Sequence, residues 1–332
     1  MNIILFNFRG LGDSTIMANA IEKYRNELKN YRITIITWSK NELIFSQLKR
    51  EHEILYISGP RKNKYSYFLS SCYRIFKLLK GRQFDKAINF SGDFKENIYL
   101  LFVNSLQKIS PIWDREHKMN NVITQPLLRY KNDIYIDSEI ENIYKIYDYI
   151  FGLVLNTKKV ELLHLEPQKV IKSIGLFPFS AQECRDWPLE NWDSIGLKIL
   201  KSGYGVYYFC SDQEINQISN FKSLSKGALI SSEMLKVKTK VDFLICQDSF
   251  STHLAHFIKL PSITIFGANN PSLFSTGSSE VIATDGGCKY YPCYNKPKCI
   301  NQTSQYSCIS SIKVNTVFDV LNSELILVDE KI

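Results

Sequence analysis

Short apolar runs alternate with segments of helical periodicity along most of this chain, and no other feature limits its possible folds as strongly. Residues 2–8 form an apolar run, and after a glycine turn apolar residues recur every three or four positions from Ile16 to Leu28. Further strands are predicted over 32–38, 54–58 and 85–91, and helices over 41–50 and 67–80. Parallel strands need a covering crossover, so the pattern predicts a parallel sheet with helices on both faces.

The alternation stops after about residue 114 and resumes near residue 171. A helical pattern over 136–155 and a polar segment over 156–169 join the two parts, which predicts two domains, 1–155 and 156–332. The predicted fold class is α/β with two similar doubly wound halves, and we allow the final helix to pack back on the N-terminal domain. In the second half strands are predicted over 171–178, 205–210, 242–246 and 262–266, and helices over 189–201, 213–221 and 251–259.

Hydrophobic patterning and charge also limit the location and partners of the chain. The most apolar window, 136–155, is interrupted by five charged residues, so any membrane contact must be peripheral. The N-terminus has no basic segment before its short apolar run, and the cysteines are expected to be reduced. We therefore expect a cytoplasmic protein, with peripheral contact to the inner face of the cytoplasmic membrane allowed. A net charge of +8 favours phosphate-bearing partners only mildly, and no nucleic-acid partner is expected.

The turn after the first apolar run reads Gly10-Leu11-Gly12-Asp13. Ligands of open α/β sheets bind outside the carboxyl ends of the strands, so this turn is expected to face a ligand. Asp13 is either the N-cap of the next helix, which the motif alone favours, or a carboxylate that accepts a proton. Thr15 occupies the third glycine position of the dinucleotide-binding pattern, which disfavours nicotinamide binding.

A polar loop follows the strand predicted over 171–178. It contains Ser180 and Arg185, and the fork of an arginine side chain suits the oxygens of a diphosphate. The alternative is a surface turn in which Trp187 and Trp192 fasten the next helix to the sheet.

A second polar turn runs from Gln247 to His253, between a predicted strand and a predicted helix. Asp248 and the amides of residues 249–252 are placed where the phosphates and hydroxyls of a nucleotide sugar can meet a helix N-terminus. A hydrolase triad is disfavoured, because neither serine has the glycine spacing of a nucleophile elbow. A metal shared by His253 and His256 is disfavoured, because no third ligand is evident nearby.

Four late cysteines have the spacing C-x4-C-x5-C-x8-C, namely Cys288, Cys293, Cys299 and Cys308. Four thiolates suit a structural zinc or iron ion, although structural zinc sites usually contain a tighter first pair. The alternative is a loop of reduced thiols.

Basic residues are dense in the first half. Arg61, Lys62 and Lys64 follow the third predicted strand and could contact an acidic or phosphorylated acceptor. A second group, from Arg74 to Arg82, alternates with apolar residues, and we interpret it as a packing surface with a solvated face. The apolar residues of that packing surface are Tyr73, Ile75, Phe76, Leu78 and Leu79.

Taken in order, these motifs resemble the family-9 glycosyltransferases, the ADP-heptose:lipopolysaccharide heptosyltransferases. The family begins with a strand and G-x-G-D, here Gly10 to Asp13, and has a basic residue before a W-P pair, here Arg185 before Trp187-Pro188. It continues with D-S/T-x-x-x-H-L-A, here Asp248 to Ala255, then with F-G-x-x-x-P, here Phe266 to Pro271, and with a cysteine-bearing tail. The resemblance covers almost the whole chain.

The resemblance implies a GT-B fold, with two Rossmann-like domains that face each other across a cleft. It implies inverting transfer, with no cofactor required for catalysis, from a nucleotide sugar, by family default ADP-heptose, to a lipopolysaccharide-core or other glycan or glycolipid acceptor. Asp13 would be the general base, and Arg185 would neutralise the leaving diphosphate. The residues expected at the donor are Ser180, Arg185, Glu214, Asp248, Ser249, Phe250, Ser251, Thr252, His253 and Gly267, and those expected at the acceptor are Gly12, Arg61, Lys62 and Lys64.

Three departures from the family pattern concern the identity of the donor. Ser14-Thr15 is polar where small and apolar residues are usual, Phe250 replaces a common glycine, and Cys210 follows a strand that typically ends in glycines. Three alternative functions remain open. One is a protein heptosyltransferase of the autotransporter type, some of which carry an iron-binding cysteine finger. The others are an epimerase that uses Asp248 and Glu214, and a catalytically degenerate protein that binds sugar nucleotides.

Overall fold

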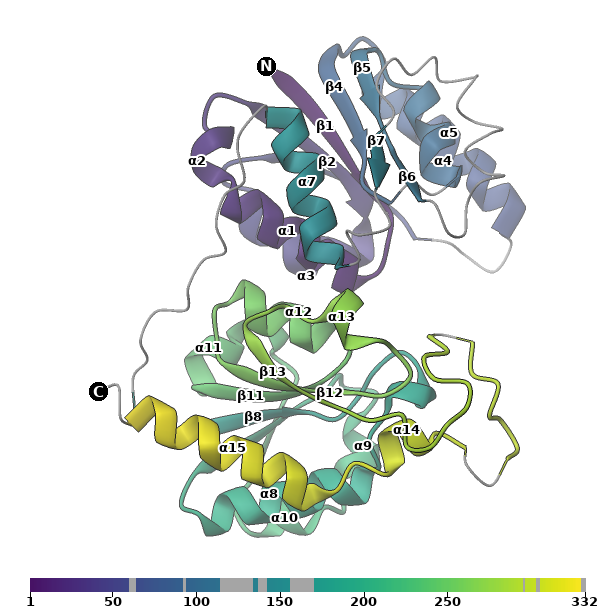
Figure 1. Ribbon diagram of the computed structural model, residues 1–332. Coiled ribbons are helices and arrows are strands. Elements are labelled where there is room, and N and C mark those ends of the chain that lie inside the picture. Colours follow the sequence, from purple (N-terminus) through teal and green to yellow (C-terminus); the bar gives the residue numbers. More distant parts are fainter. Residues whose placement is uncertain are drawn as a thin grey trace. The chain divides into compact units, whose positions relative to one another are not determined.

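The computed structural model describes residues 1–59, 64–91, 94–113, 134–136, 142–155, 170–294, 296–302 and 305–329 of the chain. The chain divides into two compact units, Met1–Leu162 and Leu163–Ile332, and each contains a parallel sheet (Figure 1). The domain boundary expected after residue 155 adjoins residues 156–169, which lie outside the described residues.

Five parallel strands form the main sheet of the N-terminal unit, in the order β3-β2-β1-β4-β5. The central strand β1 pairs with β2 on one side and β4 on the other, and it is buried from Ile3 to Asn7. The winding direction reverses between β1 and β4, which makes their carboxyl ends the topological switch point where ligands bind in such sheets. The strands are β1 (Asn2–Asn7), β2 (Arg32–Trp38), β3 (Glu53–Ile57), β4 (Phe84–Asn89) and β5 (Ser105–Ile109).

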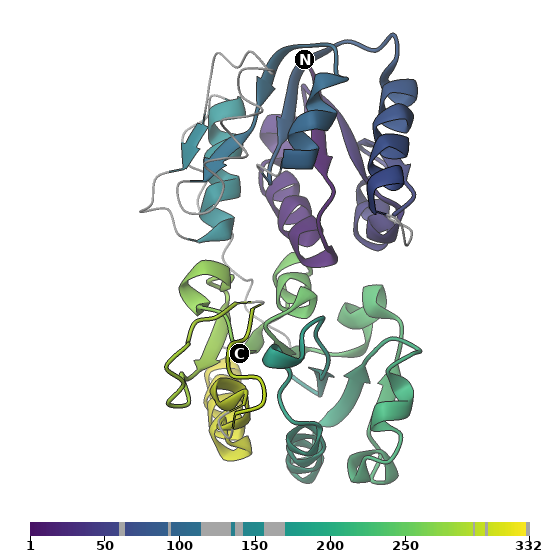
Figure 2. The same cartoon turned by 90° about the vertical axis from the view of Figure 1, so that its right-hand side faces the viewer.

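Helices cover both faces of this sheet, and Figure 2 shows the sheet between α7 in teal and α4 in blue. On one face Tyr24, just after α1, stacks on Phe151 of α7 with ring centroids 5.4 Å apart. On the other face α4 and α5 bury Ile75 and Leu100 in a cluster with residues of β1 and β2. The remaining elements are α1 (Leu11–Lys23), α2 (Arg25–Leu28), η1 (Ser39–Asn41), α3 (Glu42–Phe45), η2 (Ser46–Leu48), α4 (Lys64–Leu79), α5 (Phe94–Leu101), β6 (Pro111–Trp113), β7 (Ile134–Ile136) and α7 (Ile143–Leu155).

Six parallel strands form the sheet of the C-terminal unit, in the order β10-β9-β8-β11-β12-β13. The winding repeats that of the first unit, so the switch point lies between β8 and β11. The strands are β8 (Ser173–Phe177), β9 (Gly205–Phe209), β10 (Leu229–Ser231), β11 (Phe243–Gln247), β12 (Ser262–Phe266) and β13 (Ser279–Ala283).

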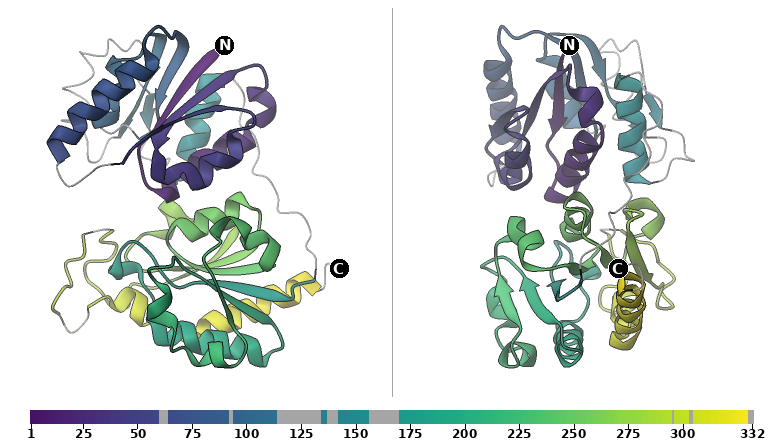
Figure 3. Two further views of the ribbon diagram at one scale, coloured as in Figure 1. Left: turned by 180° about the vertical axis from the view of Figure 1, so that it is seen from behind. Right: turned by 90° about the vertical axis from the view of Figure 1, so that its left-hand side faces the viewer.

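Two apolar clusters fill the two faces of the C-terminal sheet. Helices α8 and α15 lie on one face of the sheet, and α11 and α12 lie on the other (Figures 1 and 3). Ile199 of α8 and Leu321 of α15 pack with strand residues in one cluster, and Val237 of α11 and Leu254 of α12 do so in the other. The final helix α15 thus contributes to the core of its own unit. The helical elements are η3 (Glu183–Arg185), α8 (Leu189–Lys201), α9 (Ile215–Ile218), α10 (Lys222–Ser225), η4 (Met234–Lys236), α11 (Val237–Lys240), α12 (Phe250–Phe257), α13 (Pro271–Phe274), α14 (Ser307–Ser310) and α15 (Val314–Asp329).

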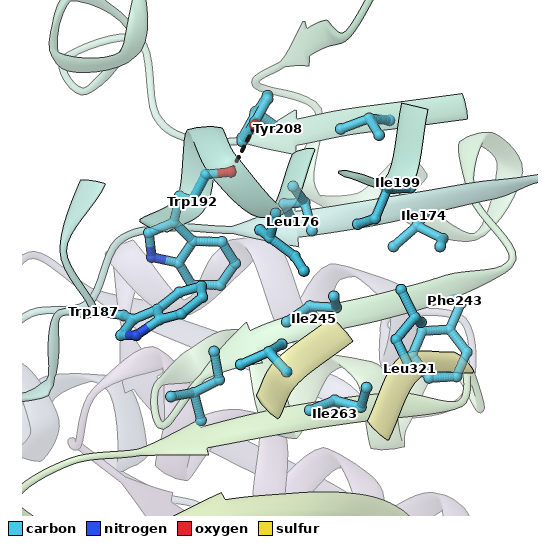
Figure 4. Packing of buried hydrophobic residues seen from close by; sticks show 14 of the residues in the cluster. Ile174, Leu176, Trp187, Trp192, Ile199, Tyr208, Phe243, Ile245, Ile263 and Leu321 are labelled. Carbon is cyan, nitrogen blue, oxygen red and sulfur yellow. Dashed lines mark hydrogen bonds between the residues drawn. The ribbon is translucent and has the colours of Figure 1, made fainter. Parts of the chain in front are cut away.

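Two tryptophans anchor this core, as Figure 4 shows. Trp187 and Trp192 are fully buried and meet edge to face, with ring centroids 5.3 Å apart. Trp187 Nε1 donates a hydrogen bond of 2.8 Å to the carbonyl of Ile312, and the hydroxyl of Tyr208 donates one of 2.9 Å to the carbonyl of Trp192. Because Trp187 is two residues beyond Arg185, the core also fixes the loop that carries this arginine.

The sequence pattern does not predict the edge strands β5, β10 and β13. These strands are short, and apolar residues such as Leu106 and Leu229 point into solvent on them, so no continuous apolar run marks them. Of the helix expected over 136–155, the structure has α7 from Ile143 to Leu155, whereas Ile136 belongs to strand β7.

Candidate functional site

Buried amides end both strands at the switch point of the N-terminal sheet. Asn7 ends β1 and Asn89 ends β4. Asn89 Nδ2 donates to Asn97 Oδ1 on α5 at 2.8 Å, and Asn89 Oδ1 accepts from the backbone nitrogen and the hydroxyl of Ser91, each at 2.9 Å. These bonds hold the loop after β4 to helix α5.

Asp13 lies in the first turn of α1, which begins at Leu11 and has Gly10 as its N-cap. The N-cap interpretation of Asp13, which the motif alone favours, is therefore wrong. The side chain is partly exposed, and within the described residues no hydrogen bond or ion pair engages its carboxylate. A carboxylate in this state can accept a proton from a ligand hydroxyl.

Buried polar side chains hold the turn that precedes Asp13. Asn7 Oδ1 accepts from the backbone nitrogen of Arg9 at 3.2 Å and from the hydroxyl of Ser14 at 3.3 Å. Asn7 Nδ2 lies 3.4 Å from the carbonyl of Asp13, and Asn41 Nδ2 donates to the carbonyl of Arg9 at 3.2 Å. Ser14, a departure from the family pattern, is thus satisfied inside this network. The sequence interpretation missed Asn7 and Asn41, and the only local signal was an asparagine at a strand end.

A buried tyrosine lies beside two carboxylates in the same unit. Glu96 Oε1 accepts from the backbone nitrogen of Phe8 at 3.2 Å. Burial raises the pKa of Tyr147 on α7 well above its usual value, and the charges of Asp13 and Glu96 raise it further while Arg9 lowers it. The phenol is therefore protonated at neutral pH. No sequence motif indicated this residue.

The structure describes only some of the residues that are expected at the acceptor. Gly12 lies beside Asp13 in the first turn of α1. Arg61 and Lys62 lie outside the described residues, and Lys64 is described only as the first residue of α4. Contact of these residues with an acceptor stays a prediction.

Asp248 follows β11 at the switch point of the C-terminal sheet, and its side chain is buried. Burial raises the pKa of Asp248 to about 6, because loss of water disfavours the charged carboxylate more than Arg185 and Asn269 favour it. Asn269 Nδ2 donates to Asp248 Oδ2 at 2.6 Å. A pKa shifted this far is typical of carboxylates at functional sites. A hydrogen bond from a ligand hydroxyl stabilises the charged form of such a carboxylate.

Arg185 ends the short turn η3 and reaches the same place. Its Nη1 donates to the carbonyl of Asp248 at 3.1 Å, and its Nε is buried with no hydrogen-bond partner in the described part of the chain. Gly267 makes room for this loop, because a Cβ there would lie 2.8 Å from the carbonyl oxygen of Cys184 and 3.3 Å from Arg185 Cα. The structure therefore brings Arg185, Asp248 and Gly267 together.

Gln247, the last residue of β11, holds the loop that carries the arginine. Its Oε1 accepts from the backbone nitrogen of Trp187 at 2.6 Å, and its Nε2 donates to the carbonyl of Pro178 and, at 3.2 Å, to Asp186 Oδ1. The same carboxylate oxygen accepts from the backbone nitrogen of Ser180 at 2.9 Å. Ser180 is thus tied to the site through its backbone. The sequence interpretation missed Gln247 and Asp186, although both adjoin residues of the motifs.

The polar side chains at the start of α12 form hydrogen bonds to nearby backbone groups. Ser249 caps the helix, and its Oγ accepts from the backbone nitrogen of Ser251. The hydroxyls of Ser251 and Thr252 donate to the carbonyl of Gln247 at 3.3 and 2.8 Å. Phe250 is partly buried against the apolar cluster of α11 and α12. The turn therefore offers a ligand main-chain N–H groups.

The other two titratable residues expected at the donor differ in their surroundings. His253 is buried, and burial, together with the charges of His256 and Arg185, lowers its pKa to about 3, so the ring is neutral at pH 7. Glu214 lies beyond β9, where its Oε2 accepts from the backbone nitrogen and the hydroxyl of Ser211, both at 2.7 Å. Within the described residues these two bonds are the only ones of its carboxylate, so it is not joined to Asp248.

The cysteine-bearing tail packs beside the same site. The backbone nitrogens of Cys293 and Tyr294 both donate to the carbonyl of Ala268, at 3.1 and 3.0 Å, next to Asn269. All eight cysteines are free thiols, and burial with neighbouring thiols raises the pKa of Cys308 to about 12. Over the described ranges, no three His, Cys, Asp or Glu side chains are placed to hold one metal ion. Cys288, Cys293 and Cys299 all contribute to the raised pKa of Cys308, and a structural metal at these four cysteines stays a prediction.

Two parallel-sheet α/β units, each with polar residues at its switch point, are characteristic of GT-B glycosyltransferases. Solved heptosyltransferases share this fold. Escherichia coli heptosyltransferase WaaC with ADP-2-deoxy-2-fluoro heptose is 12% identical over 98% of this chain and 100% of that one, with a TM-score of 0.73. A family 9 glycosyl transferase from Veillonella parvula is 14% identical over 98% and 97%, with a TM-score of 0.72. The iron-containing dodecameric glycosyltransferase TibC from enterotoxigenic E. coli is 15% identical over 97% and 75%, with a TM-score of 0.57.

A sequence model of glycosyltransferase family 9 (heptosyltransferase) matches residues 72–303, whereas no curated protein matches the chain. The chain belongs to glycosyltransferase family 9 and is a glycosyltransferase. The family and the GT-B fold class predicted from the motifs are confirmed.

Proposed function

We propose that this protein transfers heptose, with inversion, from ADP-heptose to a lipopolysaccharide-core or other surface-glycan acceptor. Family membership supports heptosyl transfer, and the sugar nucleotide in the WaaC structure supports an ADP-linked donor. The observation that carries the proposed mechanism is the unengaged carboxylate of Asp13 at the switch point of the N-terminal sheet.

Asp13 acts as the general base in this proposal. A sugar hydroxyl is a weak nucleophile at neutral pH, so its proton must leave as its oxygen attacks the anomeric carbon. A carboxylate that no other side chain engages can accept that proton without first breaking a hydrogen bond. General-base catalysis of this kind contributes roughly 10²–10⁴ in rate.

The residues around Asp248 bind the donor and stabilise the leaving group. Negative charge develops on ADP as the glycosidic bond breaks, and the guanidinium of Arg185 and the N–H groups at the start of α12 are preorganised to accept it. Arg185 Nε lacks a partner in the described structure, so a phosphate oxygen would satisfy it. The carboxylate of Asp248, oriented by Asn269, accepts hydrogen bonds from hydroxyls of the donor.

The proposed base is tested by Asp13→Asn, with Glu22→Gln near the end of the same helix as the control. We expect transfer to fall by roughly 10²–10⁴ in the first variant and to stay near the wild-type rate in the second. ADP-heptose binding, measured by calorimetry, should change less than about twofold in both variants. An Asp13→Asn enzyme with half the wild-type rate would show that this carboxylate is not the base. Donor binding without transfer in the wild type would favour the degenerate binding protein.

The proposed donor is tested by thermal unfolding with a panel of nucleotide sugars. A ligand present at about 100 times its Kd stabilises the folded state by about 2.7 kcal/mol, so the true donor raises the Tm by several degrees. We expect ADP-heptose to raise the Tm more than UDP-sugars or GDP-sugars. If another nucleotide sugar raises the Tm more, that nucleotide sugar, and not ADP-heptose, is the donor.

A structural metal at the late cysteines remains a separate prediction. Its support is the spacing of Cys288, Cys293, Cys299 and Cys308 and the iron in TibC. Elemental analysis of the purified protein and of a Cys293→Ser variant tests whether a metal is bound there. Zinc or iron at one equivalent in the wild type alone would establish the metal site. A wild-type protein without metal would show that the prediction is wrong.

A further inference from the structure

Helix α4, which is labelled in Figure 1, exposes a row of large apolar side chains. Leu69, Tyr73 and Phe76 are 70%, 66% and 46% exposed, and their spacing places them on one side of the helix. Phe102, just beyond α5, extends this row, since its ring centroid lies 6.4 Å from that of Phe76. We call these four residues, together with Arg74, Lys77 and Lys80, the α4 surface.

The α4 surface corrects one expectation from the sequence. Of the residues predicted to pack, Ile75 and Leu79 are buried on the sheet, whereas Tyr73, Phe76 and Leu78 are exposed. Cys72, Ile75 and Leu79, on an adjacent side of α4, already supply contacts to the core. The exposed row is therefore not needed for the fold of this unit.

Positive charge is concentrated around the same helix. Residues 54–84 contain seven Lys and Arg and no Asp or Glu, whereas the other 301 residues contain 34 Lys and Arg against 33 Asp and Glu. Almost all of the net charge of +8 thus comes from one segment. Arg74, Lys77 and Lys80 are exposed, and within the described part of the chain none of them forms an ion pair.

We propose that the α4 surface binds an anionic phospholipid bilayer. The apolar side chains enter the boundary between headgroups and acyl chains, and the long basic side chains extend to the phosphates. Each basic residue close to an anionic bilayer contributes about fivefold to the partition coefficient. Contact of this kind is peripheral, and among the described residues no helix has the length and apolar character to cross a membrane.

The charge distribution favours a bilayer over a second copy of this chain. A symmetric dimer through the α4 surface would place the same surface of each copy face to face, because such contacts are self-complementary. The basic segments of both copies would then repel each other without an acidic counterpart. A bilayer rich in anionic lipid supplies negative charge and an apolar layer together.

Co-sedimentation with lipid vesicles tests this proposal on the full-length protein. The vesicles contain phosphatidylcholine alone or with roughly one-third phosphatidylglycerol. Wild-type protein should bind the anionic vesicles at least about 100-fold more tightly, and this preference should shrink as salt is raised. Binding is measured without donor or acceptor, so failure here leaves the proposed transfer reaction untouched.

Two variants separate the charges from the apolar row. Arg74→Gln/Lys77→Gln/Lys80→Gln should weaken binding to anionic vesicles by about 100-fold, at about fivefold per charge. Leu69→Ser/Tyr73→Ser should weaken it by about tenfold and keep the salt dependence. Both changes lie on exposed positions, and circular dichroism and Tm verify folding.

A matched variant controls for overall charge. Lys201→Gln/Lys222→Gln/Lys226→Gln removes three exposed charges from the C-terminal unit and should bind like the wild type. The proposal is overturned if the wild type shows no preference for anionic vesicles, or if this control loses as much binding as the α4 variant. It is also overturned if sedimentation shows a dimer that the α4 changes dissociate, because a second copy would then cover the surface.

Discussion

Replacement of Asp248 by asparagine should stabilise the folded protein at pH 7 and weaken donor binding. The side chain is 3% exposed, and its pKa rises from 3.8 to about 6 on folding, which corresponds to about 3 kcal/mol. Because folding raises this pKa, the associated stability is present below about pH 4 and is lost as pH rises through about 6. Asparagine cannot ionise but weakens the hydrogen bond from Asn269, so we expect a net gain of about 1–3 kcal/mol at pH 7.

Urea unfolding between about pH 4 and pH 7.5 measures this effect, with the fluorescence of the buried Trp187 and Trp192 as the signal. The difference in free energy of unfolding between Asp248→Asn and wild type should grow with pH across this range. The control is Asp212→Asn, an exposed carboxylate beyond β9, which should show no such trend. A difference that stays flat with pH, or a variant less stable than wild type at pH 7, would refute the burial argument. ADP binding should weaken by at least about tenfold in Asp248→Asn and should not change in Asp212→Asn.

Two further changes test how the loop that carries the arginine is held. Gly267→Ala should lower the free energy of unfolding by about 1–3 kcal/mol, because the new Cβ meets the carbonyl of Cys184 at 2.8 Å. Gly59→Ala, where nothing lies within 4 Å, is the control, and equal effects in calorimetric unfolding would contradict the packing argument. Gln247→Leu should cost about 2–4 kcal/mol in urea unfolding and raise the KM for the donor, because the N–H of Trp187 loses its acceptor. Wild-type stability in that variant would show that the network is dispensable.

The strand-to-helix turns of both units could be predicted from the sequence, because glycines and polar residues after an apolar run are local signals. Residues whose partners are distant in the chain could not. Gln247 bonds to Trp187 across 60 positions, and Glu96 bonds to Phe8 across 88. Only the fold brings such pairs together.

Helix α4 shows what the helical spacing of apolar residues in a sequence can and cannot predict. It predicts which residues share a side of the helix, but it does not reveal whether another element covers that side. Ile75 and Tyr73 are both apolar, yet only Ile75 lies against the sheet. The exposure of Tyr73 and Phe76 could therefore be found only from the structure.

At the capped start of α12, the groups that fix the turn differ from the groups that the turn presents. Ser251 and Thr252 direct their hydroxyls to the carbonyl of Gln247, so in the proposed function peptide N–H groups, and not these hydroxyls, meet the donor. Every amino acid except proline supplies an identical peptide N–H. Mutation of a side chain that makes none of these bonds, such as Phe250, can thus leave the chemistry of the backbone unchanged. The backbone shape of this turn can therefore stay the same when such a side chain changes.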